Sequence, residues 1–148
     1  MINKVILETK FPKLRNTSYD VTSPRSEEYN CIAWAAGIDN QFWWPIKSTD
    51  AFWPIPLYEE TIECFIKAFN QLGYIICDDP KHEPGCEKVA IYVKENKPKH
   101  MARQLTNGKW TSKCGKSVDI VHILDSLEGE IYGKVEMFMK RPFSKKQQ

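Results

Sequence analysis

The chain has 148 residues, of which 42% are hydrophobic and 27% are charged, a composition typical of one soluble domain with a sizeable core. Its net charge of +2 excludes the strong basic field of a typical nucleic-acid binder, so nucleic acid is not expected as a partner. No apolar stretch approaches the length of a membrane span, and we expect no membrane partner.

The N-terminal segment predicts no signal peptide, because its short apolar run is soon interrupted by Glu8 and Lys10. We therefore expect a cytoplasmic protein, or one exported without a cleaved signal peptide. Five cysteines are an odd number, which argues against a closed disulfide framework. Residues 1–25 read as a short strand or arm followed by a loop, since turn formers such as Pro12 and Pro24 recur there.

A first helix is predicted over residues 27–36, where an apolar run begins at Ile32 and Gly37 provides a stop. Ser26 supplies a capping residue just upstream. Cys31 then lies near the positive end of the helix dipole, which favours thiolate over thiol. Two interpretations fit this residue: a thiol nucleophile, or a small core residue of a commonly buried type.

Residues 38–56 are rich in aromatic side chains and in prolines, which argue against a regular helix or a central strand. Trp43, Trp44 and Trp53 are the most prominent of these side chains. Such residues in an irregular segment either cap the core or form the wall of a substrate cleft.

The second half of the chain predicts a helix and then a sheet. Apolar residues at helical spacing indicate a helix over residues 62–72, and Gly73 ends it. Strands are predicted over residues 74–77, 88–94, 100–105, 109–114 and 131–140. Asn107-Gly108 is a strong hairpin signal. Ser117 is expected to cap a third helix over residues 118–127, and residues 141–148 form a basic tail. One α+β domain over residues 1–148 follows, with N-terminal helices packed on a small antiparallel sheet.

Cys31 and His100 form the best candidate catalytic pair. A thiol hydrolase needs an imidazole to take the thiol proton and a third polar group to orient that imidazole. Because side chains alternate along strands, the turn decides which neighbours share the face of His100. A two-residue turn at Asn107-Gly108 places Thr111 and Lys113 on the same face as His100. A turn that is one residue longer places Ser112 and Cys114 on that face instead. Asp119 is the first carboxylate after the hairpin and is the preferred orienter.

Other residues offer alternatives to this pair. A zinc site could combine four side chains, although no two cysteines have the usual CxxC spacing. These four are Cys77, His82, Cys86 and Cys114. His122 could replace His100 as the base, or it could be a hydrogen-bonded helix residue. Arg103 and Lys113 could bind an acidic substrate, or they could form a solvated strand face.

The order of these elements resembles the papain-like fold in its compact NlpC-type form, found in bacterial cell-wall peptidases and related amidases. In that family a helix-borne cysteine is followed by a strand, a His-led strand, a turn like Asn107-Gly108 and a further strand. The resemblance implies a supporting role for Tyr19 and places Ser112 at the imidazole-orienting position. Ser112 is a weaker polar group than the family usually carries there, and Asn30 precedes the cysteine where the family commonly has Asp.

The chain also resembles an uncharacterised family of small bacterial proteins over most of its length. The shared segments are Tyr29 to Ala35, Trp43-Trp44-Pro45, Ala102 to Leu105 and Trp110 to Lys113. This resemblance implies no function.

These observations lead to a cysteine hydrolase of the peptidase or amidase type as the first hypothesis. The Cys31 thiolate would attack an amide or ester carbonyl of a peptide or protein substrate, and His100 would move the proton. The backbone N–H of Cys31, with Tyr19, would stabilise the oxyanion, and the three tryptophans would shape the cleft. No cofactor or metal is expected. The alternatives are a non-catalytic binding domain on the same scaffold, or a bacterial effector or toxin that uses the same thiol chemistry.

Overall fold

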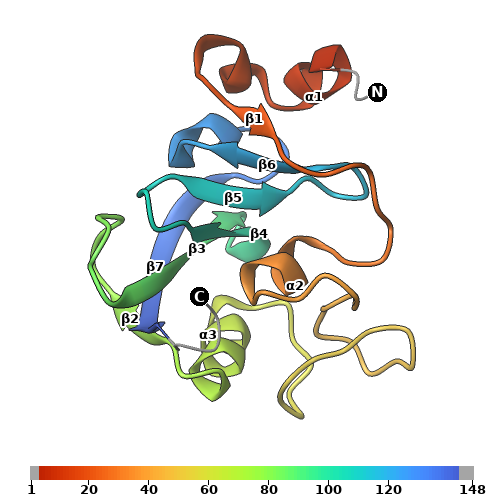
Figure 1. Cartoon of the computed structure of the whole chain (residues 1–148). Helices are drawn as coiled ribbons and strands as arrows, with labels where there is room; N and C mark the ends of the chain where they lie inside the picture. Colours follow the sequence, from red (N-terminus) through yellow and green to blue (C-terminus); the bar gives the residue numbers. More distant parts are fainter. Residues whose placement is uncertain (1–3, 144–148) are drawn as a thin grey trace.

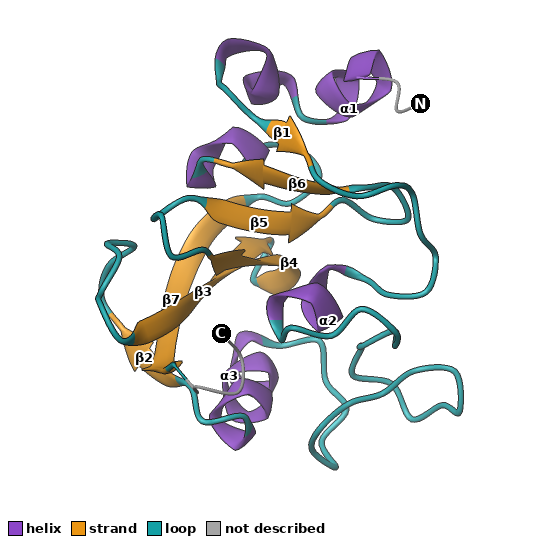
Figure 2. Ribbon diagram, viewed as in Figure 1, coloured by secondary structure: helices purple, strands orange, loops and turns teal. Residues whose placement is uncertain are grey.

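Seven strands form one open antiparallel sheet in the computed structural model, which describes residues 4–143 (Figures 1 and 2). The strands are β1 (Asp20–Val21), β2 (Ile75–Cys77), β3 (Cys86–Lys94), β4 (Lys97–Gln104), β5 (Trp110–Lys113), β6 (Asp119–His122) and β7 (Lys134–Pro142). Their order is β1-β6-β5-β4-β3-β7-β2. Strands β3 to β6 therefore form a meander, and β7 returns to the other side of β3. The predicted α+β class is confirmed.

Side-chain alternation along the central strands divides the core into two layers, one on each face of the sheet. Val89, Ile91 and Met101 belong to a cluster with the helices α2 (Cys31–Ala35) and α3 (Ile62–Gln71). Their neighbours along the same strands face the other way. Ala90, Tyr92, Ala102 and Ile120 pack with residues from α1 (Lys4–Lys10), η1 (Pro12–Asn16) and η2 (Leu124–Leu127). We call these two sides the α2 face and the α1 face.

Several predicted elements are confirmed. The helix expected over residues 62–72 is α3, capped by Thr61, whose hydroxyl accepts a hydrogen bond from the Cys64 N–H. The hairpin at Asn107-Gly108 joins β4 to β5, and Gly108 has a φ of 86°. The first helix forms too, but it begins at Cys31 rather than at residue 27, because the Asn30 side chain caps it instead of Ser26.

Three local predictions are wrong. Residues 118–127 form β6 and the short helix η2 rather than a helix, since β6 pairs with both β5 and β1. The N-terminal segment contains α1 and η1 rather than a strand, because Leu7, Phe11 and Leu14 all pack into the core of the α1 face. The tail begins later than predicted, since β7 continues to Pro142, and residues 144–148 lie outside the described chain.

The described helices include none that is both long and apolar enough to span a membrane.

Candidate functional site

Cys31 occupies the first position of α2, and its side chain is almost fully enclosed, with 9% of the residue exposed. It belongs to the apolar cluster on the α2 face, together with Ile32 and Met101. Burial raises the pKa of the Cys31 thiol to about 11, against the opposing effects of backbone hydrogen bonds from Met101, Cys31 and Ile32 and of the Lys113 charge. The helix dipole therefore does not make this thiol a thiolate at neutral pH.

His100 lies in β4 with no exposed surface, opposite Tyr92 in the strand pairing. Its ring stacks on Tyr132, with centroids 3.9 Å apart and an angle of 8° between the planes. Its Nε2 atom is 2.9 Å from the Ser112 hydroxyl, and that hydroxyl is also 2.7 Å from Nε2 of His122. One serine therefore links two buried imidazoles on the α1 face.

The hydrogen bonds define the protonation of both rings. The Nδ1 atom of His122 lies 2.6 Å from the Ile123 carbonyl oxygen, which can only accept, so Nδ1 carries the proton. Nε2 of neutral His122 must then accept from Ser112, and Ser112 in turn accepts from the Nε2–H of His100. Nδ1 of His100 is left with a lone pair and no hydrogen-bond partner among the described residues.

Burial keeps both imidazoles neutral. It holds the pKa of His100 well below its usual range, with a further contribution from the nearby His122. It also lowers the pKa of His122 to about 4, although the bond to Ile123 opposes the shift. These rings are structural hydrogen-bonding groups near neutral pH.

No hydrogen bond joins the Cys31 thiol to His100, so the catalytic pair stays a prediction. Cys31 packs in the apolar cluster of the α2 face, but its thiol also interacts electrostatically with Cys114 and with Tyr132, and His100 stacks on Tyr132. The Nδ1 atom that would serve as the base has no hydrogen-bond partner among the described residues. Strand alternation explains this outcome, since Met101, the residue after His100, is the one that reaches the Cys31 cluster.

Ser112 does contact His100, as the resemblance implied and as the longer of the two considered turns predicts. Asp119 does not, because its carboxylate lies on the α2 face and accepts a hydrogen bond of 2.7 Å from the Tyr29 hydroxyl. Burial raises the pKa of Asp119, and the bonds from Tyr29 and Ser23 oppose that shift. The Tyr19 hydroxyl donates to Glu8.

The three tryptophans mainly cap the core rather than line a cleft. Trp43 and Trp53 are 4% and 7% exposed, and Trp44 and Trp53 both pack against Phe65 of α3. Trp53 also borders a shallow hollow on the surface.

The four residues of the considered zinc site are not assembled. Within residues 4–143, no three His, Cys, Asp or Glu side chains are arranged to hold a metal ion. Cys114 lies on the α1 face, whereas Cys77 and Cys86 are partly exposed near the β2 edge of the sheet.

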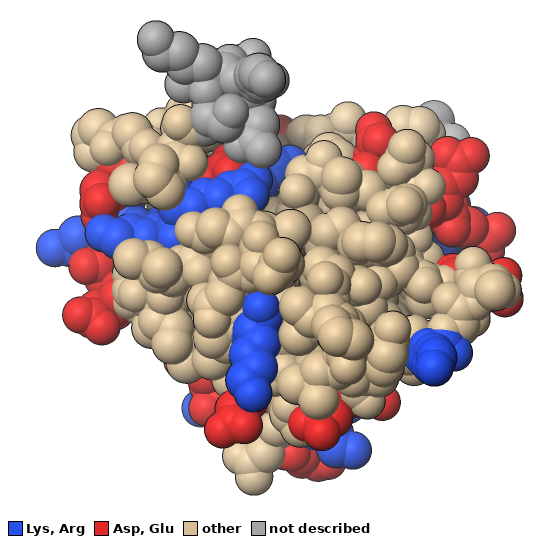
Figure 3. Space-filling view, turned by 90° about the horizontal axis from the view of Figure 1, so that it is seen from below, with Lys and Arg blue, Asp and Glu red and all other residues tan. Residues whose placement is uncertain are grey.

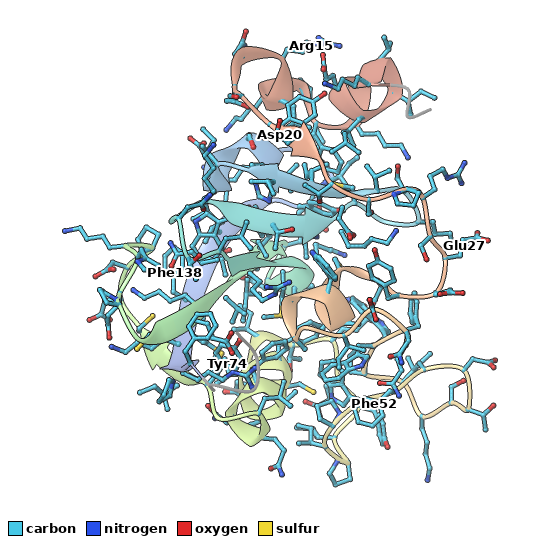
Figure 4. The ribbon with its side chains drawn as sticks, in the orientation of Figure 1. Arg15, Asp20, Glu27, Phe52, Tyr74 and Phe138 are labelled. Carbon is cyan, nitrogen blue, oxygen red and sulfur yellow. The ribbon has the colours of Figure 1, made fainter. Side chains whose placement is uncertain are left out.

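A pocket of about 960 Å³ opens between α1, the segment after β1 and the β5–β6 turn. Leu7, Val118 and Tyr132 contribute apolar walls. All the charged residues that line it are basic: Lys10, Arg25 and Lys116. We call it the N-terminal pocket. It lies at the β1 end of the molecule, where Figure 4 labels Asp20, and far from Phe52 on the loop at the other end.

Sequence reasoning missed Tyr29 and Lys113 as partners in the polar cluster around Asp119. The Lys113 ammonium is buried and donates to the carbonyl oxygens of Ser26 and Ser117, with the Tyr29 ring 5.0 Å from its nitrogen. The only available signal was register, since Lys113 and Asp119 are paired across β5 and β6. The pocket gave no signal, because α1 itself was not predicted.

Together these features define an α+β domain with an open antiparallel sheet, a buried imidazole pair and one sizeable pocket with a basic rim. The chain belongs to the family described as "Domain of unknown function (DUF7689)", which matches residues 20–140. The match includes Cys31, His100 and Ser112 but not α1. No curated protein and no solved structure matches the chain.

Proposed function

We propose that this protein is a non-catalytic binding domain whose N-terminal pocket takes an amphipathic anion, with an apolar body and one carboxylate or phosphate group. The observation that carries the proposal is the combination of apolar walls with charges of one sign. Lys10, Arg25 and Lys116 are all exposed and basic, and no acidic residue lines the pocket.

The shape of the pocket fits a small organic ligand. Its volume of about 960 Å³ lies within the range of about 300–1,000 Å³ that small-molecule sites usually have. Leu7, Phe11 and Val118 are buried walls that would contact the apolar part of the ligand. Ile6 and Ile131 are 57% and 43% exposed at the opening, so a ligand would also cover apolar surface that is now in water.

The basic side chains would fix the orientation of the ligand. Arg25 follows β1, and Lys116 lies in the β5–β6 turn, so two separate segments converge on one end of the pocket. A carboxylate or phosphate placed there gains charge-assisted hydrogen bonds. A cationic head group with the same tail would be repelled.

The test is a calorimetric titration of the purified protein with decanoate and, separately, with a cationic surfactant of the same chain length. We expect saturable binding of decanoate only. Arg25→Gln and Lys116→Gln should each weaken that binding about two- to fivefold, the range for exposed ion pairs. Lys109→Gln is the matched control, because Lys109 is exposed on the other hairpin and does not line the pocket. Equal binding of both surfactants, or of neither, would refute the proposal.

A cysteine hydrolase on a papain-like scaffold is the second candidate, and two observations favour it. The Nδ1 lone pair of His100 is unpartnered, as a free general base would be, and Cys31 begins a helix. This activity would require the thiol and the imidazole to come together after a rearrangement that also opens both to solvent. A peptide or protein substrate and an effector role belong to this second candidate.

A further inference from the structure

Arg25 and Lys116 lie on two chain segments that run side by side along the N-terminal pocket. Strand β1 pairs antiparallel with β6. Beyond β1 the two segments stay in contact, because the Ser26 N–H donates a hydrogen bond of 3.2 Å to the Ser117 carbonyl oxygen. Arg25 and Lys116 directly precede these two residues, and both are exposed and line the pocket. Two positive charges therefore converge on one edge of the pocket.

The buried ammonium group of Lys113 holds these two segments together. Its Nζ atom donates a hydrogen bond of 2.7 Å to the Ser26 carbonyl oxygen and another to the Ser117 carbonyl oxygen. Burial lowers the pKa of Lys113, while the charge of Asp119 opposes this shift and the nearby charge of Arg25 adds to it. Asp119 is paired with Lys113 across β5 and β6, and it offsets the charge of Lys113. The convergence of the two segments is thus a built feature of the fold.

Arg25 and Lys116 have no acidic partner of this kind. No acidic residue lines the pocket, and neither side chain forms an ion pair within residues 4–143. Lys10 adds a third positive charge from α1. Figure 3 shows a different arrangement on the lower face, at the opposite end of the molecule, where basic and acidic side chains both appear around a largely uncharged centre. Like charges that lie together repel each other, and a bound anion would remove this repulsion.

We propose that the N-terminal pocket selects a phosphate monoester with an apolar body over singly charged carboxylates and sulfates. This inference rests on the proposed function, which requires an amphipathic anion but does not specify its head group. A phosphate monoester carries nearly two negative charges above about pH 7, because its second pKa is about 6. A carboxylate carries only one, so it would neutralise less of the charge that Arg25 and Lys116 bring together. Both side chains also form short charge-assisted hydrogen bonds to phosphate oxygens.

The test is a calorimetric titration of the full chain with decyl phosphate, decyl sulfate and decanoate at about pH 8, where only the phosphate is doubly charged. We expect decyl phosphate to bind about three- to tenfold more tightly than decyl sulfate, the effect of one further negative charge on two exposed cations. Arg25→Gln and Lys116→Gln should each reduce this preference by about twofold or more. Lys109→Gln is the matched control and should retain it, because Lys109 is exposed outside the pocket.

Inorganic phosphate, titrated in the same way, separates the head group from the whole ligand. It should bind at least about tenfold more weakly than decyl phosphate, since it buries no apolar surface. Equal affinity for decyl phosphate and decyl sulfate would overturn this inference and leave the proposed function standing. So would a phosphate preference that both variants retain in full, or inorganic phosphate that binds as tightly as decyl phosphate. Binding of none of the decyl compounds or decanoate would overturn both proposals.

Discussion

Ser112 connects two buried imidazoles through one hydroxyl group, and both rings depend on it. Its substitution by alanine leaves the Nε2–H of His100 without an acceptor and Nε2 of His122 without a donor. Since each unsatisfied buried group costs about 1–3 kcal/mol, Ser112→Ala should lower the free energy of unfolding by about 2 to 4 kcal/mol. Urea denaturation measures this change. Thr106→Ala, in the exposed turn after β4, is the control and should cost little. Similar losses in the two variants would contradict the hydrogen-bond assignment.

The reactivity of Cys31 separates the two candidate functions. With a pKa of about 11, only about one Cys31 thiol in a thousand is ionised near pH 8, and its surroundings exclude the reagent as well. Iodoacetamide should therefore label the partly exposed Cys77 and Cys86 first in native protein, and Cys31 only after unfolding. Peptide mass spectrometry identifies the labelled residues. Fast native labelling at Cys31 that His100→Ala abolishes would instead support the hydrolase.

At the residue scale, the sequence identified the polar side chains better than their contacts. The link between His100 and Ser112 could be expected, because a hairpin with one extra turn residue places both on one face of the sheet. The lack of a hydrogen bond between Cys31 and His100 could not be expected, since it depends on which face of the sheet α2 covers. No local pattern around Cys31 specifies that choice. His122 was a candidate base, but its role as a partner of Ser112 required the unpredicted strand β6.

At the scale of elements, Asn30 joins α2 to the aromatic segment. Its Oδ1 accepts hydrogen bonds from the backbone N–H groups of Ala33 and Trp43, and its Nδ2 donates to the Trp43 carbonyl. The first bond caps the helix, whereas the other two hold a loop that has little regular structure of its own. The same side chain therefore fixes the position of the helix and of the loop against each other.

This double role predicts that Asn30→Ala is more costly than the loss of an ordinary cap. Helix capping alone contributes about 1 kcal/mol, and the two bonds to Trp43 are lost as well, so the free energy of unfolding should fall by about 2 to 4 kcal/mol. Thr61→Ala removes only the cap of α3 and should cost about 1 kcal/mol. Thermal or urea unfolding of both variants gives the comparison. Equal losses would mean that the contacts with Trp43 contribute nothing.

Elements defined by local signals were predictable, and elements defined by pairing were not. The hairpin at Asn107-Gly108 and helix α3 follow from a turn dipeptide and from helical spacing with a capping threonine. Residues 118–127 also have apolar residues at helical spacing, but β5 and β1 offer strand partners on both sides. Tertiary context then overrides the local preference. Helix α1 had a usable signal in the spacing of Leu7, Phe11 and Leu14, which was obscured by the turn formers after it.

At the scale of the whole molecule, the sheet separates two kinds of surface. The N-terminal pocket borders the α1 face and has a basic rim, whereas the shallow hollow beside Trp53 is lined mostly by apolar and hydroxyl side chains. The net charge of +2 averages over 21 basic and 19 acidic side chains and so gives no sign of a local basic rim. Sequence composition therefore argues against a uniform basic field but cannot reveal the basic rim of one pocket.

The buried imidazoles also make the stability of the whole fold sensitive to acid. The pKa of His122 falls from its ordinary 6.5 to about 4 on folding, and that of His100 falls in the same direction. Between pH 6.5 and about pH 4, His122 is protonated in the unfolded chain but neutral in the folded one. The free energy of unfolding therefore decreases as the pH is lowered through this range. For His122 the full loss of stability is about 3 kcal/mol, and none of it occurs at a pH well above 6.5, the ordinary pKa of histidine.

Comparison with His122→Asn isolates this contribution from that of Asp119, whose raised pKa acts in the opposite direction. The variant should be less stable at neutral pH, because Ser112 loses its acceptor, but its stability should depend less on pH. The natural chain should exceed the variant in free energy of unfolding at neutral pH, and this difference should shrink by about 3 kcal/mol by about pH 4. Urea denaturation at each pH measures it. A constant or growing advantage at acid pH would show that His122 is not held neutral by burial.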